Sequence, residues 1–447
     1  MKLWRRIIVF LVVGGLMVGG IALLGMAQKN MTLSVACEAD QFANYLKVMA
    51  KQFKEETGIE VKVDILGYSE HRQKITQDYT TNTIQYDLAT VDTVWTGEFE
   101  EKEWTVDLTP FIKRDYLEIN VPDIMPVGFE IFTWKDKLIA FPMSGYSLSL
   151  VYRKDLLDDP KEKAAFKEKY GYELQVPKTM EQMADVATFF TRPKEDFYGL
   201  VAGGARGVCC GQEYMTYLKC FNARIFDEKG NVTLNSPEGL AALKFFVRIF
   251  DEWAPPGAAA YWWDGRETAY RMGKVLMQIT WSISRPGYEL PDFSKIIGKT
   301  AMAAHPSIPG VKTSYGYGGW GIGINADISE DRQEAAWGFI KFITSPENQK
   351  AWMLTSWQEY GSPGDTGMPI RLSTLIDPEL NEKNPWLKDT MLIEFIHGDF
   401  SFRPPVPEYA QIESILGLYA NMAIAHELTP EEALAKATNE IKAIYEK

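Results

Sequence analysis

The chain has 447 residues, of which 46% are hydrophobic and 24% charged, which indicates a folded protein of two or three domains and excludes a disordered one. The net charge of −13 argues against nucleic acid or an anionic membrane surface as the partner, because both bind clustered Lys and Arg. The 4 His residues lie far apart in the sequence, so we expect no multi-His metal site, and we predict no cofactor. Aromatic residues make up 13% of the chain, which is an unusually high share.

Residues 1–27 have the layout of an export signal. Basic residues near the start precede an uncharged apolar run, Ile7–Ala27, which ends in the small-residue sequence Gly25-Met26-Ala27. The run is also long enough to span a bilayer, so cleavage after Ala27 and retention as an anchor both remain open. In either case we expect the rest of the chain to lie in the periplasm or at the extracellular face of the cytoplasmic membrane.

Export permits disulfide bonds among the 4 cysteines. Cys209 and Cys210 are adjacent, Cys220 follows about three helical turns later, and Cys37 is far away in sequence. This spacing leaves three interpretations open. Cys220 can pair with Cys209 or Cys210, the two adjacent residues can form a vicinal bond, or all the thiols are free and buried.

Strand and helix patterns alternate directly after the signal segment. The predicted elements are a strand at Thr32–Cys37, a helix at Gln41–Thr57 that Gly58 can end, a strand at Ile59–Ile65, a helix at Glu70–Tyr79 and a strand at Tyr86–Val91. This βαβαβ order predicts a parallel sheet with helices on its faces. Binding residues in such sheets gather at the carboxyl ends of strands, here Glu38–Gln41 and Asp92–Trp95.

The rest of the chain continues as mixed α/β structure. A tight turn at Trp134–Lys137 leads into a strand at Leu138–Phe141, which we expect Pro142 to interrupt before a new strand at Leu148–Tyr152. Further strands are predicted at Val275–Thr280, Thr300–Ala304 and Gly321–Asn325. Helices are predicted at Pro160–Lys169, Thr179–Phe190, Pro237–Trp253, Glu330–Ile343, Pro346–Thr355, Glu408–His426 and Pro430–Tyr445.

Four stretches resemble a known family, the extracytoplasmic solute-binding proteins of ABC importers, in the sugar-binding group that includes maltose-binding protein. Gln52–Ile59 (QFKEETGI) is similar to the family's first helix and the turn that follows it, and Lys137–Asp155 (KLIAFPMSGYSLSLVYRKD) resembles the crossover between lobes. Gly318–Asn325 (GGWGIGIN) with Glu334–Thr344 (EAAWGFIKFIT) resembles the return strand and its helix. Pro177–Met183 (PKTMEQM) resembles the opening of a second-lobe helix. Each motif is loose alone, but their order over nearly the whole chain is specific.

The resemblance implies an α/β fold of the periplasmic-binding-protein type, a Venus flytrap of two discontinuous lobes joined by a hinge. We expect the first lobe to comprise residues 28–142 and the return segment 298–327. The second lobe would comprise residues 143–297 and 328–447, with the C-terminal helices. The implied function is that of a monomeric substrate-binding subunit, which captures a sugar or oligosaccharide between the lobes and delivers it to the membrane permease of an ABC transporter.

A neutral sugar presents hydroxyl groups around its rim and C–H faces above and below, so its site needs carboxylates or amides together with aromatic rings. Each residue type has a structural alternative to ligand binding. Asp40 and Glu38 could instead serve as helix N-caps, and any single Trp could instead pack in the core. Weaker candidates are the Trp262-Trp263 pair, Arg285 and Arg371. The candidates at strand ends and at positions that resemble the family are Glu38, Asp40, Gln41, Asp92, Trp95, Tyr146, Arg206, Gln212, Tyr214, Trp281 and Trp320.

Two alternatives are an exported carbohydrate-active enzyme and a solute-binding sensor subunit. The 60 acidic residues would permit a catalytic carboxylate pair, but the sequence has neither a Gly-x-Ser-x-Gly nor a His-Glu-x-x-His motif. Gly316–Gly321 satisfies Gly-x-Gly-x-x-Gly but leads into a predicted strand, so it offers no helix N-terminus for phosphate. We therefore predict a binding protein and not an enzyme, and turnover of a bound sugar would decide between the two.

Overall fold

The structure, a computed structural model, describes residues 31–39, 42–311, 315–359, 369–383, 387, 398–399, 403–404 and 406–446. The predicted signal segment and the candidates Asp40 and Gln41 lie outside the described residues. Among the helices that the structure does describe, none is both long enough and apolar enough to cross a membrane.

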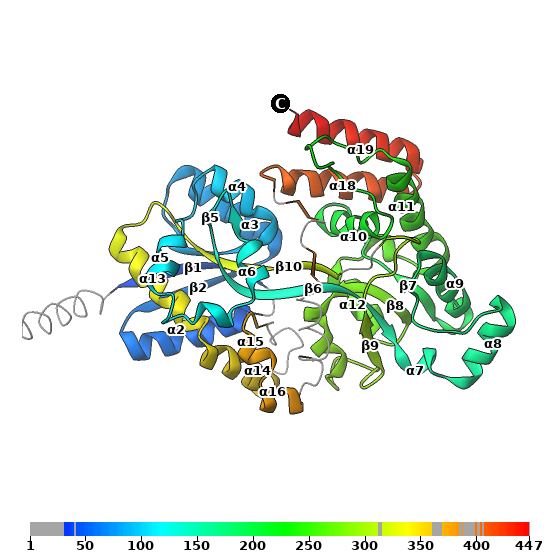
Figure 1. Ribbon diagram of the computed structural model, residues 1–447, viewed down its shortest axis with the longest axis horizontal. Coiled ribbons are helices and arrows are strands. Elements are labelled where there is room, and N and C mark those ends of the chain that lie inside the picture. Colours follow the sequence, from blue (N-terminus) through cyan, green and yellow to red (C-terminus); the bar gives the residue numbers. More distant parts are fainter. Residues whose placement is uncertain are drawn as a thin grey trace, which may run out of the picture.

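Two α/β lobes lie side by side and are joined by two long strands that run through both (Figure 1). These strands, β6 (Phe141–Arg153) and β10 (Tyr315–Ile324), pair antiparallel along most of their length. On one side β10 pairs with β3, and on the other β6 pairs with β8, so a single hydrogen-bonded sheet passes from lobe to lobe in the order β2-β1-β3-β10-β6-β8-β7. The predicted two-lobed architecture, with each lobe built from separate stretches of chain, is confirmed.

The first lobe is built on β1 (Thr32–Glu38), which lies between β2 (Glu60–Leu66) and β3 (Leu88–Asp92) and is parallel to both. The predicted elements here are confirmed, including the end of α2 at Gly58, whose φ of 80° suits a residue without a Cβ. The helices and short strands of this lobe are α2 (Ala43–Thr57), α3 (Tyr68–Thr81), η1 (Thr93–Trp95), α4 (Thr96–Glu101), α5 (Thr109–Arg114), η2 (Val121–Asp123), α6 (Pro126–Glu130), β4 (Thr133–Trp134) and β5 (Lys137–Leu138).

The second lobe contains β7 (Tyr198–Val201), β8 (Val275–Trp281) and β9 (Thr300–Ala303). The helices predicted at Pro160, Thr179 and Pro237 are confirmed, whereas β7, α10 and α12 had not been predicted from the sequence. The helical elements of this part of the chain are α7 (Lys154–Leu157), α8 (Pro160–Tyr170), α9 (Met180–Phe190), η3 (Pro193–Glu195), α10 (Val208–Cys220), α11 (Pro237–Arg248), η4 (Ile249–Trp253), η5 (Ala258–Ala260), α12 (Trp263–Arg271) and η6 (Ser282–Glu289).

The C-terminal part is shared between the lobes, although the prediction placed all of residues 328–447 in the second. In α13, Phe339 packs against Phe53 of α2 with ring centroids 5.3 Å apart, and in α14, Trp352 stacks on Tyr45 at 3.9 Å. These two helices therefore cover the first lobe, because their aromatic residues complete its apolar core. The elements are α13 (Glu330–Ile343), α14 (Pro346–Glu359), α15 (Leu372–Leu375), α16 (Pro378–Lys383), β11 (Gly398–Asp399), α18 (Tyr409–Ile424) and α19 (Pro430–Tyr445), the last two against α10 and α11.

The predicted interruption at Pro142 is wrong, because β6 runs without a break from Phe141 to Arg153. Pro142 lies opposite Gly321, beside a register shift between Trp320 and Gly321. A proline has no N–H to donate, and a bulge in the ladder accommodates it at this position. The continuous strand is what joins the two lobes.

The four cysteines, Cys37, Cys209, Cys210 and Cys220, are all buried free thiols. Their spacing left three interpretations open, and the structure agrees with the one in which no disulfide forms. Burial raises the pKa of the Cys210 thiol well above its usual range, which leaves this group protonated and unreactive.

Candidate ligand-binding site

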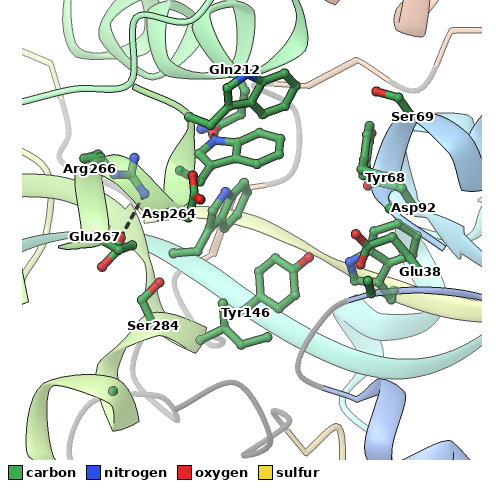
Figure 2. Close-up of a pocket in the computed structure, with 18 of the residues that line it drawn as sticks. Glu38, Tyr68, Ser69, Asp92, Tyr146, Gln212, Asp264, Arg266, Glu267 and Ser284 are labelled. Atoms are coloured by element: carbon green, nitrogen blue, oxygen red, sulfur yellow. Dashed lines mark hydrogen bonds and ion pairs between the residues drawn. The ribbon is translucent and has the colours of Figure 1, made fainter. Parts of the chain in front are cut away.

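A cavity of about 920 Å³ opens between the lobes where the two long strands cross. The first lobe contributes the residues that follow β1, β2 and β3, and the second contributes α10, α12 and the segment after β8. Figure 2 shows residues from both sides facing the same space. The residues that line the cavity include Glu38, Tyr68, Asp92, Tyr146, Gln212, Trp263, Arg266, Glu267, Trp281, Trp320 and Arg403.

Aromatic rings form much of the cavity wall. Tyr146 of β6 meets Trp281 edge to face, with centroids 5.1 Å apart and an interplanar angle of 75°. Tyr68 of the first lobe meets Trp263 of the second in the same manner at 6.1 Å. Trp320 of β10 completes the wall beside Tyr68, at 6.0 Å. Rings in several orientations can cover more than one C–H face of a ligand.

Asp92 is the centre of the polar groups on the first lobe. It ends β3 and accepts a hydrogen bond from the Tyr68 hydroxyl at 2.9 Å, while its other oxygen accepts from the Val94 N–H and so caps the start of η1. Burial beside Asp92 raises the pKa of Tyr68 well above its ordinary value, so the phenol stays a donor. The carboxylate is therefore held in a fixed orientation at the cavity wall.

Arg403 connects the two lobes at this point. Its Nη2 donates to Glu413 of α18 at 3.0 Å, and its Nη1 lies 3.8 Å from the Asp92 carboxylate. The guanidinium also lies over Trp281, 5.8 Å from the ring centroid. Burial raises the pKa of Glu413. One arginine thus joins a buried acid of the second lobe to the strand-end acid of the first.

The deep wall of the second lobe is a buried charge network around Arg266, whose side chain is 1% exposed. Arg266 donates to Glu213, to Glu267 at 3.0 Å, and to the Thr280 hydroxyl at 2.6 Å. Figure 2 shows the contact with Glu267 at the edge of the cavity. Burial raises the pKa of Glu213 to about 7 despite the neighbouring guanidinium. Nearby, the Trp263 indole N–H donates to Gln212 at 2.9 Å, which holds that ring in place.

The structure brings together six of the predicted candidates, each of which comes from a different element. Glu38 and Asp92 line the cavity from the first lobe, Gln212 and Trp281 from the second, and Tyr146 and Trp320 from the crossing strands. The weaker candidates Trp262 and Trp263 line it as well.

Three predicted candidates lie away from the cavity. Trp95 is 1% exposed and packs beneath the wall against Trp320 at 5.5 Å. Tyr214 is buried and donates to the Gly239 carbonyl, and Arg206 pairs at the surface with Glu427 at 3.0 Å. Of the weaker candidates, Arg371 is buried in lobe packing, where it contacts Asp123.

Sequence reasoning missed several residues of the wall. Tyr68 lies just after the end of β2, and Glu38 ends β1, so the strand-end rule would have found Tyr68 if it had been applied to the second strand. Arg403 has no local signal, because its role depends on which part of the first lobe its segment meets. Among the described residues, no group of three or more His, Cys, Asp or Glu is arranged to hold a metal ion.

Comparison with known proteins agrees with this architecture. The model of the bacterial extracellular solute-binding protein family matches residues 39–350. A curated protein of Sinorhizobium fredii, named "Probable amino-acid ABC transporter periplasmic-binding protein", is 24% identical and covers 89% of this chain and 85% of its own length.

Two solved structures extend the comparison. A solute-binding protein of Agrobacterium radiobacter K84 in complex with ribitol is 36% identical, with a TM-score of 0.83, and covers 93% of this chain and 99% of its own. Maltose-bound MalE3 of T. maritima is 25% identical, with a TM-score of 0.78. The match covers 93% of this chain and 100% of the MalE3 chain. The family and these relatives are binding proteins, not enzymes. The chain described here belongs to the bacterial extracellular solute-binding proteins.

Proposed function

We propose that this chain is the substrate-binding subunit of an ABC importer and that it binds a polyhydroxylated ligand, a sugar or a sugar alcohol. The observation that carries the proposal is the wall of the cavity, where aromatic rings and oriented carboxylates from both lobes face the same space. We propose Glu38, Asp92, Tyr146, Gln212, Trp281 and Trp320 as ligand contacts. The ribitol and maltose bound by the two structural relatives support this ligand class.

The proposed mechanism is closure of the lobes around the ligand without chemistry. A ligand that contacts both lobes binds the closed form more tightly, and so shifts the population toward it. The closed monomer would then dock on the permease at the outer face of the membrane, without any nucleic acid partner. We place the lobe boundaries near residue 142, between β9 and β10, and after α14, in place of the boundaries near residues 297 and 327 predicted from the sequence.

A binding role also accounts for the state of the buried carboxylates. Glu267 is held by Arg266 at 3.0 Å and accepts from the Tyr288 hydroxyl at 2.7 Å, while Asp92 is held by Tyr68. Acids that are fixed as acceptors suit hydroxyl recognition, whereas a glycosidase needs one carboxyl that donates a proton. We therefore propose that the bound sugar leaves unchanged.

Calorimetric titration of the chain from Gln28 onward tests the proposal. The panel contains sugar alcohols, monosaccharides, disaccharides and amino acids, and chromatography of each ligand before and after shows whether it is altered. We expect saturable binding of a sugar or sugar alcohol that is recovered intact. Binding of amino acids alone would reject the ligand class, and consumption of the sugar would reject the binding role.

Trp281→Ala locates the binding in this cavity. We expect its Kd to rise about tenfold, because the ligand loses one ring that covers a C–H face. Trp134→Ala is the matched control, since Trp134 is equally half-buried but lies in the β4–β5 hairpin, outside the cavity. Equal Kd values for both variants would place the ligand elsewhere.

A further inference from the structure

The cavity continues beyond its aromatic centre along one face of α12. Asp264, Glu267 and Arg271 all line it, and their spacing of three and four residues places them on the same side of the helix. Seven residues of α-helix rise about 10 Å, so the lined face extends well past Trp263. Figure 2 shows Asp264, Glu267 and Ser284 across the space from Glu38 and Asp92.

The cavity-lining residues at the far end of this face, with those of η6 and the loop after it, are called here the outer subsite. The loop after η6 is held against the end of α12 by a hydrogen bond from the Lys295 N–H to the Arg271 carbonyl, 2.9 Å long. Phe293 of this loop lines the cavity and is 38% exposed, so it presents apolar surface that a ligand can cover. The outer subsite comprises Arg271, Ile283, Ser284, Gly287 and Phe293.

Arg271 differs from the other two arginines that line the cavity. Arg266 contacts the carboxylates of Glu213 and Glu267, and Arg403 lies beside those of Glu413 and Asp92.

In the described part of the chain, no carboxylate lies within ion-pair distance of Arg271, whose Nη2 donates to the hydroxyl of Thr268 at 3.2 Å. Its Nε is buried and has no partner there. A guanidinium left without an acid in a binding cavity is available to an acceptor on the ligand.

We infer that the outer subsite binds a second unit of the ligand and that Arg271 pairs with a carboxylate on that unit. The ligand class is then an acidic disaccharide or glycoside, whose first unit occupies the aromatic centre proposed above. This inference rests on the proposed function. A guanidinium binds a carboxylate through stronger hydrogen bonds than a hydroxyl group, so the acidic form of a given disaccharide is favoured over its neutral parent.

Matched pairs of sugars test the inference directly. Lactitol, maltitol, cellobiitol and melibiitol are titrated beside lactobionate, maltobionate, cellobionate and melibionate, which carry a carboxylate in place of the terminal hydroxymethyl group of these open-chain neutral parents. For at least one pair we expect the acid to bind about tenfold more tightly than its parent, a difference that falls as salt is raised.

The variant Arg271→Gln should remove this preference, so that the acid binds no more tightly than its neutral parent. Arg206→Gln is the control, because it removes the same charge from the second lobe at a surface position outside the cavity. We expect it to keep the preference.

The outcomes distinguish failure of the outer subsite from failure of the proposed function. If sugars bind but no acid binds more tightly than its parent, the outer subsite is rejected while the proposed function stands. The outer subsite is likewise rejected if monosaccharides or sugar alcohols bind as tightly as any acidic disaccharide, or if Arg271→Gln keeps the preference. If no sugar or sugar alcohol binds at all, the proposed function itself is rejected.

Discussion

At the scale of single residues, the most unusual feature is the amount of charge buried in and behind the cavity wall. Arg266, Glu213 and Glu267 are buried together in the second lobe, and Arg403, Glu413 and Asp92 are buried together where the lobes meet. Buried ions are costly unless they are paired and hydrogen-bonded, so such groups are retained where they position a surface. Here they orient the polar wall of the site.

Glu213 should make stability depend on pH in a defined window. Its pKa is raised by burial from 4.5 to about 7, so between these values the folded state keeps a proton that the unfolded state releases. The unfolding free energy contributed by this group therefore falls as the pH rises through that window, by up to about 3 kcal/mol. Urea unfolding of wild type and Glu213→Gln at pH 5 and pH 8 measures the difference.

The variant should show the smaller loss of stability on going to pH 8. Glu228→Gln serves as the control, because Glu228 is exposed and its replacement should leave the pH dependence of wild type unchanged. Parallel curves for Glu213→Gln and wild type would show that the buried carboxyl does not titrate in this window.

At the scale of elements, the close approach of β6 and β10 determines how the lobes are joined. The strands carry glycines where they cross, and a Cβ added to Gly319 would lie 2.3 Å from the carbonyl oxygen of Ser144. Because that atom belongs to the backbone, it cannot move without separating the two strands. The glycine is therefore required by packing rather than by a special backbone conformation.

Replacement of Gly319 by Ala should destabilise the protein by about 1–3 kcal/mol, the usual range for overpacking. Gly67→Ala is the control, since nothing lies within 4 Å of the Cβ it would add, and its effect should stay within about 0.5 kcal/mol. Thermal and urea unfolding measure both variants. Equal stability of the two would mean that the crossing strands separate without penalty.

At the scale of the whole molecule, two contacts hold the lobes together beside the cavity. Tyr68 of the first lobe meets Trp263 of the second, and Arg403 reaches Asp92 from the segment before α18. Tyr68 also donates to Asp92, so the two contacts form one connected group. These contacts between side chains hold the lobes together without ligand, so we expect them to set how much of the unliganded protein is open.

Arg403→Gln should weaken this connection. We expect a loss of about 3 kcal/mol of stability, because Glu413 is left buried without its partner. Without ligand, small-angle X-ray scattering should give a larger radius of gyration than for wild type, and saturating ligand should reduce the difference. Arg206→Gln breaks a surface pair with Glu427 and a hydrogen bond to Asn421, both within the second lobe, so it should leave the radius of gyration unchanged. An unchanged radius for Arg403→Gln would show that the contact does not control opening.

Much of the first lobe and part of the site could be predicted from the sequence. The alternation of apolar residues at periods of two and 3.6 identifies β1, α2, β2, α3 and β3, and the strand-end rule then finds Glu38 and Asp92. These predictions succeed because each depends only on neighbours a few residues apart. The discontinuous lobes were predicted from the resemblance to the family. Local patterns do not predict them, because they depend on which distant segments pack together.

Other features depend on contacts between distant parts of the chain. Trp95 lies just after β3 and Trp281 is the last residue of β8, but Trp95 packs in the core against His71 and Trp320, whereas Trp281 lines the cavity beside Tyr146. The strand-end rule selects both residues, and the tertiary neighbours of each decide whether its ring is buried in the core or lines the cavity. Contacts between distant parts of the chain also decide three other features. They are the unbroken strand at Pro142, the position of Arg403 beside Asp92, and the division of the C-terminal helices between the lobes. The sequence by itself determined most of the secondary structure, because helices and strands follow from local pattern. Only the tertiary structure decided which side chains face the ligand, because burial is a property of surfaces that meet after folding.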